Sequence, residues 1–369
     1  MKIYRFLCLV LCIFIISGCE TKVEDYSKKK YKITKIEELS NLPVEKDSNL
    51  SSGVVNNNKF YFQSSRIDPK YNISKDDKIF SYDISKHDLK ELNVDYLYTT
   101  FEFVEFEGSY IYTEVIPGET EMEPFSFKVI EEKDHVKKVL NEGITFSWLE
   151  LPRYTIHKNK LYTIIKKIIP IENYTIDVKA NLDYALMCYE KGSLKRVYGK
   201  TQEINNSNLN EDASMLGSTW FNTAVSDNML MIYEQNKNSS LIHYLIDDEW
   251  HEYKVPFVVV EALAFDDYII LQNEDKKTKI LNIHNQKISD FDYEGAINSS
   301  EYIGDNSRIY FNDEGITRVM HINKDGKAEY LYIDLDKDNH VGYPSWYITK
   351  EGIIIQYGLD HYMLTIDKD

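Results

Sequence analysis

The stretch SDNMLMIY (226–233) joins a polar turn to a run of apolar residues, and this arrangement recurs along the chain. It returns as NNNKFYF (56–62), EGSYIYTEV (107–115), HKNKLYTII (157–165), FDDYIILQ (265–272), GDNSRIYF (304–311) and TKEGIIIQY (349–357). Short runs rich in Ile, Val, Tyr and Phe, bounded by Asn, Asp and Gly, are typical of β-strands that follow tight turns. We therefore expect an all-β, repetitive fold.

Each of these runs is followed by a second strand-like segment, such as LIHYLID (241–247), and six of the seven continue into a third. A further strand precedes each turn, as in GSTWFNTAV (217–225). The strands that follow the turns are anchored at Phe60, Tyr110, Leu161, Leu230, Ile269, Ile309 and Ile353, which are 39 to 69 residues apart. Four strands repeated seven times predict a seven-bladed β-propeller. Six or eight blades, a pair of β-sandwiches and a solenoid are the alternatives.

The two ends of the repeat array complement each other. The seventh repeat stops after HYMLTID (361–367) without a fourth strand, while YKITKIEEL (31–39) is a strand-like run with no repeat of its own. Propellers leave only short, protected edges. We therefore expect residues 31–39 to form the outer strand of the seventh blade, within a propeller domain of residues 31–369. The long step between the third and fourth repeats carries insertions around 166–183 and 200–216, which we expect to shape one face.

The first nineteen residues have the features of an export signal. A basic start (residues 1–5) precedes eleven uncharged, mostly apolar residues (6–16), too few for a membrane-spanning helix of about 20 residues but suitable for a signal core. The segment ends in Ile16-Ser17-Gly18-Cys19, which resembles the lipobox of bacterial lipoproteins. The resemblance implies cleavage before Cys19 and acylation of its thiol. Residues 1–18 are then the signal peptide and 19–30 a lipidated, flexible tether. A membrane helix that ends in cysteine is the alternative.

This reading places the protein on the outer face of a bacterial cell membrane, with the lipid bilayer as its partner through Cys19. Two acyl chains hold a protein stably on a membrane where one does not. Of the four cysteines, Cys8 and Cys12 leave with the signal, so only Cys188 remains in the exported domain. A single thiol cannot form an internal disulfide, and the domain must rely on its core.

The chain is acidic, with 60 Asp and Glu against 43 Lys and Arg and a formal charge of −17. Such a balance argues against nucleic acid or another polyanion as a partner. A solvated acidic surface is the simplest explanation. A cationic ligand or a basic partner is the functional alternative.

The sequence lacks the common catalytic motifs, including the nucleophile elbow, the zinc-protease helix and the Walker A loop. No cofactor is expected from it. One segment resembles a calcium loop, because Asp334, Asp336 and Asp338 alternate as oxygen ligands for a hard cation would. Asn339 and Ser345 depart from the calcium-loop pattern. An acidic loop between blades is the alternative.

Aromatic residues precede the turns in several repeats, where an inner strand of a propeller reaches one mouth of the central channel. Aromatic faces with a few charged groups suit sugars or peptide side chains. The predicted ligand-binding residues are Trp148, Glu150, Arg153, Trp220, Glu301, Tyr302 and Trp346. The alternative is that these rings wedge between blades.

The sequence therefore predicts a membrane-anchored extracytoplasmic binding protein that recognises a protein or a glycan of the cell envelope on a propeller face. An enzyme acting on carbohydrate, of the glycosidase or lyase type, is the rival class, since two carboxylates at the channel mouth could serve that chemistry. An envelope-assembly scaffold is the third. A fold alone does not decide among them.

Overall fold

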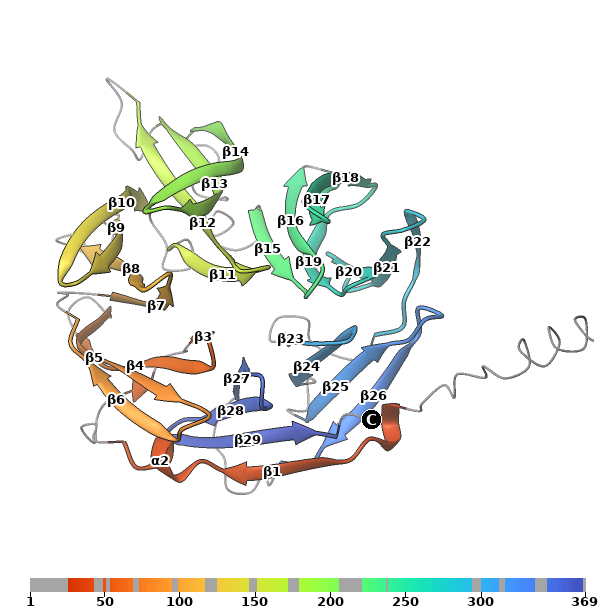
Figure 1. Ribbon diagram of the computed structural model, residues 1–369. Helices are drawn as coiled ribbons and strands as arrows, with labels where there is room; N and C mark the ends of the chain where they lie inside the picture. Colours follow the sequence, from red (N-terminus) through yellow and green to blue (C-terminus); the bar gives the residue numbers. More distant parts are fainter. Residues whose placement is uncertain are drawn as a thin grey trace, which may run out of the picture.

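The computed structural model describes residues 26–42, 49–50, 54–68, 73–94, 99–116, 125–145, 151–171, 179–205, 221–236, 238–293, 300–311, 316–335 and 344–367. They form seven antiparallel sheets arranged in a ring (Figure 1). The predicted seven-bladed β-propeller is confirmed. In each blade the strands follow one another from the axis of the ring to its rim.

The first blade has an inner strand in two pieces, because β2 and β3 both pair with β4. The strands of the first three blades are β2 (Asn49–Leu50), β3 (Val54–Asn56), β4 (Lys59–Asp68), β5 (Ile73–Asp83) and β6 (Asp88–Leu92); β7 (Thr99–Phe106), β8 (Ser109–Ile116), β9 (Phe125–Lys133) and β10 (Val136–Thr145); and β11 (Arg153–His157), β12 (Lys160–Pro170), β13 (Lys179–Glu190) and β14 (Ser193–Asn205).

The remaining blades each have one continuous inner strand. Their strands are β15 (Phe221–Val225), β16 (Leu230–Asn236), β17 (Ser239–Ile246) and β18 (Glu249–Val255); β19 (Val259–Ala264), β20 (Tyr268–Asn273), β21 (Thr278–Asn282) and β22 (Lys287–Asp290); β23 (Ser300–Gly304), β24 (Ser307–Phe311), β25 (Thr317–Ile322) and β26 (Ala328–Ile333); and β27 (Ser345–Ile348), β28 (Ile353–Tyr357), β29 (Asp360–Ile366) and β1 (Tyr31–Lys35).

The ring closes as predicted, through the N-terminal strand. Strand β1 pairs with β29 over five positions, from Tyr31 opposite Ile366 to Lys35 opposite Tyr362. The strand is shorter than the predicted 31–39, because Glu37–Ser40 form the short helix α2. This helix turns Leu39 into the junction between the seventh and first blades, where the side chain is fully buried.

The structure also differs from the predicted tether over residues 26–30. Tyr26–Lys28 form a short 3-10 helix, η1, and Tyr26 is only 7% exposed. Its ring stacks on His321 of β25 at 4.7 Å, and its backbone N–H donates to Glu329 of β26 at 3.2 Å. Burial of this aromatic ring against the sixth blade explains why the packed domain begins before residue 31.

The hydrophobic core consists of seven clusters, one at each junction between neighbouring blades. The second strand of a blade contributes to two of them, because alternate side chains point to opposite faces. In β28, Ile353 and Ile355 pack against the sixth blade, whereas Ile354 packs against the first. Burial on both faces explains why these strands read as continuous apolar runs.

The tight turns explain the polar half of each repeat. Asn57 and Asn58 have φ angles of 49° and 61°, and Asp305 and Asn306 both have 50°. Two successive positive φ values match the right-handed twist of a hairpin and favour Asn, Asp and Gly. Because strands alternate in direction, the turns between the first and second strands of all blades lie at one end of the axis. We call this the turn end.

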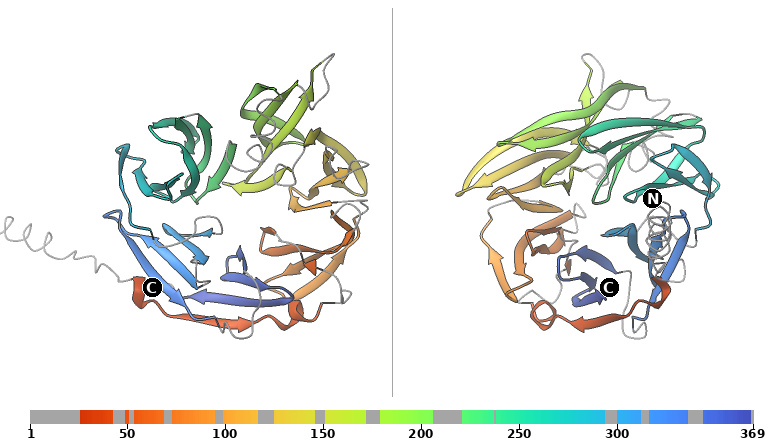
Figure 2. Two further views of the ribbon diagram at one scale, coloured as in Figure 1. Left: turned by 180° about the vertical axis from the view of Figure 1, so that it is seen from behind. Right: turned by 45° about the vertical axis from the view of Figure 1, so that its right-hand side comes forward.

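The third blade is the largest, since β13 and β14 contain 12 and 13 residues. Its strands reach beyond the neighbouring blades in both views of Figure 2. Part of the insertion predicted around 166–183 thus continues β12 and β13. Within the described residues, no helix has the length and apolar character needed to cross a membrane.

Candidate binding site

The structure describes four of the seven predicted ligand-binding residues, Arg153, Glu301, Tyr302 and Trp346. Trp148, Glu150 and Trp220 lie outside the described residues. Arg153 begins β11 and is exposed. Glu301 and Tyr302 are neighbours on β23, the inner strand of the sixth blade.

Trp346 packs between blades. It lies on β27, is 6% exposed, and belongs to the core cluster between the sixth and seventh blades. Its ring is therefore covered by protein and does not face a ligand in this structure. This is the wedge arrangement that the sequence analysis left open.

Arg308, on β24, ties three inner strands together. Its guanidinium donates to the carbonyl oxygens of Val225 (3.3 Å), Ala264 (2.9 Å) and Ser300 (3.0 Å), which belong to the fourth, fifth and sixth blades. The side chain is 5% exposed. The planar fork of a guanidinium suits such a three-way contact, which an ammonium group would not reproduce.

Glu301 places a carboxyl group beside this buried cation. Burial raises the pKa of Glu301, and the charge of Arg308 partly offsets the effect. The Glu301 side chain is exposed, so surrounding water moderates this effect on its pKa. No hydrogen bond joins its carboxyl to another described residue.

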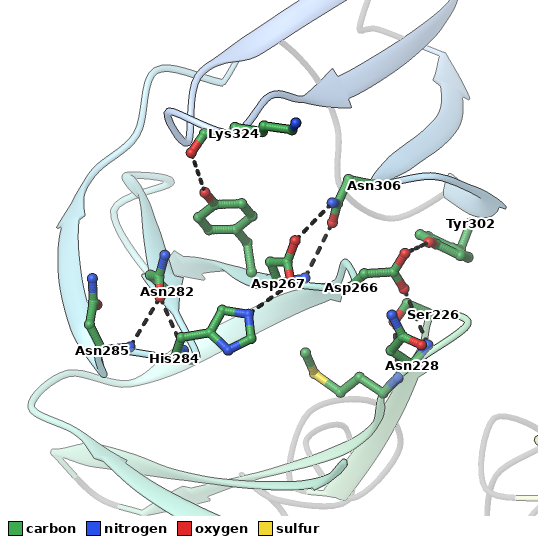
Figure 3. A network of polar contacts seen from close by, with 12 residues as sticks. Ser226, Asn228, Asp266, Asp267, Asn282, His284, Asn285, Tyr302, Asn306 and Lys324 are labelled. Atoms are coloured by element: carbon green, nitrogen blue, oxygen red, sulfur yellow. Dashed lines mark hydrogen bonds and ion pairs between the residues drawn. The ribbon is translucent and has the colours of Figure 1, made fainter. Parts of the chain in front are cut away.

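Tyr302 and Asp266 form the next part of the site (Figure 3). The Tyr302 hydroxyl donates to Asp266 Oδ2 at 2.5 Å, and the backbone N–H of Asn228 donates to Asp266 Oδ1 at 3.2 Å. Burial and the Asp266 carboxylate raise the pKa of Tyr302, so the phenol keeps its proton. Asp266 thereby joins the inner turns of the fourth and fifth blades to the inner strand of the sixth.

The neighbouring carboxylate, Asp267, also links blades. It accepts hydrogen bonds from Asn306 Nδ2 at 3.2 Å and His284 Nε2 at 2.8 Å, and its backbone N–H donates to Asn306 Oδ1 (Figure 3). Asp267 and Asn306 belong to successive blades, so this pair fastens the fifth blade to the sixth. Because Asp267 makes these contacts within the protein, its role is to hold the fifth and sixth blades together.

Asp227 differs from these paired carboxylates. Its side chain is exposed in the inner turn of the fourth blade, and it makes no hydrogen bond with a described residue. A Cβ atom added to Gly304 would lie 3.6 Å from Asp227 Oδ2, so the carboxyl reaches across to the sixth blade. Partial burial and the nearby Asp266 carboxylate raise the pKa of Asp227.

We call Asp227, Asp266, Tyr302, Arg308 and Glu301 the axial carboxyl site. Asp227 lies near Asp266, and Asp266 binds Tyr302. Tyr302 is paired with Arg308 across β23 and β24, and Glu301 is linked to the group through Arg308. Asp266 is held by its neighbours, whereas Asp227 and Glu301 keep free acceptor oxygens in surroundings that disfavour their charge. A ligand cation placed beside them would relieve this cost. Perturbed carboxyls of this kind are candidates for function as well as for structure.

The sequence analysis named Glu301 and Tyr302 of this site, but not Asp227, Asp266 or Arg308. The sequence does carry a signal for Asp227 and Asp266, because SDN, FDD and GDN place an Asp in the inner turns of three successive repeats. Arg308 is a charge inside the apolar strand SRIYF. Its position alone does not reveal that it spans three blades.

The predicted calcium loop falls largely outside the described residues, which include Asp334 but not Asp336 or Asp338. The backbone N–H of Asp334, just after β26, donates to the Tyr31 hydroxyl at 2.8 Å. In the part of the chain that the structure describes, no three His, Cys, Asp or Glu side chains are grouped to hold a metal ion.

Comparison with known proteins supports the class of fold. No protein-family model and no curated protein matches the chain. An oligogalacturonate lyase in complex with manganese superimposes with a TM-score of 0.50 and 10% identity over 93% of this chain and 95% of that one. The Dos1 propeller gives 0.44 and 10% over 91% and 94%. At these identities the likeness concerns the fold alone.

A puromycin-hydrolyzing peptidase of Mycobacterium tuberculosis gives a TM-score of 0.49 and 7% identity over 90% of this chain and 52% of that one. The chain therefore spans about half the length of that peptidase. By its fold, the protein is a seven-bladed β-propeller.

Proposed function

We propose that this protein is a lipid-anchored, extracytoplasmic binding protein that recognises a positively charged group at the axial carboxyl site. The observation that carries the proposal is the state of Asp227 and Glu301. Both carboxyls have raised pKa values, and neither receives a hydrogen bond from a described residue. An ammonium or guanidinium group of a ligand would supply the missing donors and charge.

The inner turns favour the same ligand chemistry. Acidic residues stand in the inner turns of five blades, at Glu107, Asp227, Asp266, Asp305 and Glu351, whereas lysines stand in two, at Lys158 and Lys350. Surfaces lined by one sign of charge raise the local concentration of the opposite sign. The turn end is thus suited to attract a basic ligand from solution.

The anchoring half of the proposal rests on the lipobox-like segment that ends at Cys19, outside the described residues. Cys19 lies seven positions before Tyr26, which packs against the sixth blade. Such a segment reaches at most about 25 Å. A lipidated Cys19 would therefore hold the sixth blade close to the bilayer.

Binding is tested with agmatine, which carries a guanidinium and an ammonium group, by isothermal titration calorimetry in buffers of different ionisation enthalpy. We expect proton release at acidic pH, where the two carboxyls are partly protonated in the free protein, because the bound cation lowers the pKa of both carboxyls. Asp227→Asn or Glu301→Gln should each weaken binding about fivefold. The matched control is Asp247→Asn, which removes an exposed carboxylate from the outer turn of the fourth blade. Equal affinities for all four proteins would refute the axial site.

Anchoring is tested separately with Cys19→Ser in a bacterial host that processes lipoproteins. We expect the wild type to partition with the detergent phase in Triton X-114 and to incorporate labelled palmitate, and the variant to do neither. Unchanged partitioning and processing of the variant would refute the lipid anchor while leaving the binding proposal intact.

A further inference from the structure

A pocket of about 400 Å³ lies at the seam where the seventh blade meets the first. Its apolar floor is formed by Ile36, which follows β1, by Met363 of β29, and by Tyr82 and Ile84 of the first blade. Ile36, Tyr82 and Ile84 are at most 6% exposed, so the floor is part of the packed junction. We call this the seam pocket.

Glutamate side chains surround the floor. Glu37 and Glu38 belong to α2, and Glu351 comes from the inner turn of the seventh blade. Asn58 Nδ2 donates to Glu351 Oε1 at 2.7 Å and orients that carboxylate. All three are exposed, so three negative charges border one apolar surface.

The basic residues at the pocket do not cancel this charge. Lys35 pairs with Asp360 at 2.9 Å. His87 Nδ1 lies 2.8 Å from the Tyr82 hydroxyl. His87 Nδ1 also lies 4.0 Å from Glu38 Oε1, so a charged His87 would pair with one of the glutamates. Even then the three glutamates and Asp360 outnumber Lys35 and His87, and the rim keeps a net negative charge.

We propose that the seam pocket binds a small amphipathic amine, with its apolar body on Ile36, Ile84 and Met363 and its ammonium group among the three glutamates. Pockets of about 300–1,000 Å³ with an apolar lining and a few placed polar groups are typical of small-ligand sites. The lining comes from four parts of the chain, residues 34–38, residues 82–87, Glu351 and residues 363–365, that converge on one point. This concave arrangement suits a compact ligand better than an extended peptide. The site is separate from the axial carboxyls and does not depend on them.

The test uses 4-phenylbutylamine as the probe, with 4-phenylbutan-1-ol and 4-phenylbutyrate as neutral and anionic analogues, titrated into the mature chain by calorimetry or ligand-observed NMR. The amine should bind about fivefold more tightly than the alcohol, and the carboxylate more weakly than both. Equal affinities for the amine and the alcohol would overturn the role of the glutamates.

Variants locate the probe. Glu38→Gln combined with Glu351→Gln should weaken amine binding about fivefold without changing the affinity for the alcohol. The matched control, Glu91→Gln, removes an exposed carboxylate from β6 of the first blade, outside the pocket, and should leave both affinities unchanged. Both glutamates of the double variant are exposed, so the fold should survive, which the thermal midpoint verifies. An equal effect of the double variant on amine and alcohol would place the probe elsewhere.

The alternative occupant is a basic polypeptide. The peptide acetyl-Lys-Phe-Lys-amide, titrated in the same way, separates the two. Weaker or similar binding of the peptide supports the small-amine site. Binding at least tenfold tighter than the amine, with the same loss in the glutamate double variant, would overturn the proposal in favour of a polypeptide ligand.

Discussion

His361 lies on β29 with 0% of its surface exposed, and its ring packs across the seam against Phe60 and Phe62, with ring centroids 6.0 Å away. Its Nδ1 donates to the carbonyl oxygen of Leu359 at 3.2 Å, while Nε2 is buried without a hydrogen-bond partner among the described residues. Burial lowers the pKa of His361 to about 4. A proton on Nε2 would place an unsolvated charge at the closure of the ring. We therefore expect His361 to make the propeller sensitive to acid.

The sign and size of this effect follow from linkage. The unfolded chain takes up the proton near the ordinary histidine pKa of about 6.5, and the folded protein only near 4. The neutral ring therefore contributes fully to stability above pH 6.5, and the contribution is lost as the pH falls through the window from 6.5 to 4. A shift of this size corresponds to about 3 kcal/mol in total, of which about 2 kcal/mol is lost between pH 7 and pH 5.

The assay is urea unfolding of the wild type and His361→Gln at pH 7 and pH 5. Glutamine can donate to the same carbonyl but does not titrate, so the wild type should lose about 2 kcal/mol more than the variant between the two pH values. Other buried groups, including His157 and His243, are common to both proteins and cancel. His251→Gln, at an exposed position of β18, is the control and should behave as the wild type does. Parallel pH profiles for the wild type and His361→Gln would refute the reasoning.

Three further predictions concern closure, the inner strands and the axial site. Deleting residues 31–35 exposes the edge of β29 and should lower the thermal midpoint by about 10 °C, whereas deleting residues 20–25 should not change it. Arg308→Met leaves buried carbonyls without donors and should cost about 3 kcal/mol in urea unfolding, against less than about 0.5 kcal/mol for Arg153→Met at an exposed inner-strand position. The pKa values of Asp227 and Glu301 are raised. As the pH is lowered, agmatine affinity should therefore begin to fall at a higher pH than it would if both carboxyls titrated like an ordinary carboxyl, near 4.3. An affinity that is flat down to pH 4.5 would contradict the last of these.

The blade pattern could be predicted because it depends on local rules. Six of the seven predicted anchors, all except Tyr110, are at most 4% exposed. Tyr110 is half-buried and borders a smaller pocket of the second blade. The missing fourth strand of the last repeat correctly indicated the closing strand, because it leaves the outer edge of the seventh blade unpaired, and an unpaired strand edge is a liability.

The polar sites could not be predicted to the same depth, because they depend on which blades become neighbours in space. The contact between Tyr302 and Asp266 joins residues that are 36 positions apart, and Arg308 reaches Val225 over 83 positions. The composition of the Trp346 segment is equally compatible with a channel mouth or with a wedge between blades. Only the packing of the sixth blade against the seventh distinguishes them.

The most direct test of the account is photo-crosslinking in the cell with p-benzoylphenylalanine at position 228, in place of the exposed Asn228 beside Asp227, and at position 254 on the outer strand β18 as the matched control. We predict a crosslinked product in the membrane fraction from position 228 but not from position 254. The yield of this product should fall when Glu301→Gln is combined with the probe at position 228. A product of equal yield in the Glu301→Gln background, or equal products from both positions, would contradict binding at the axial carboxyl site.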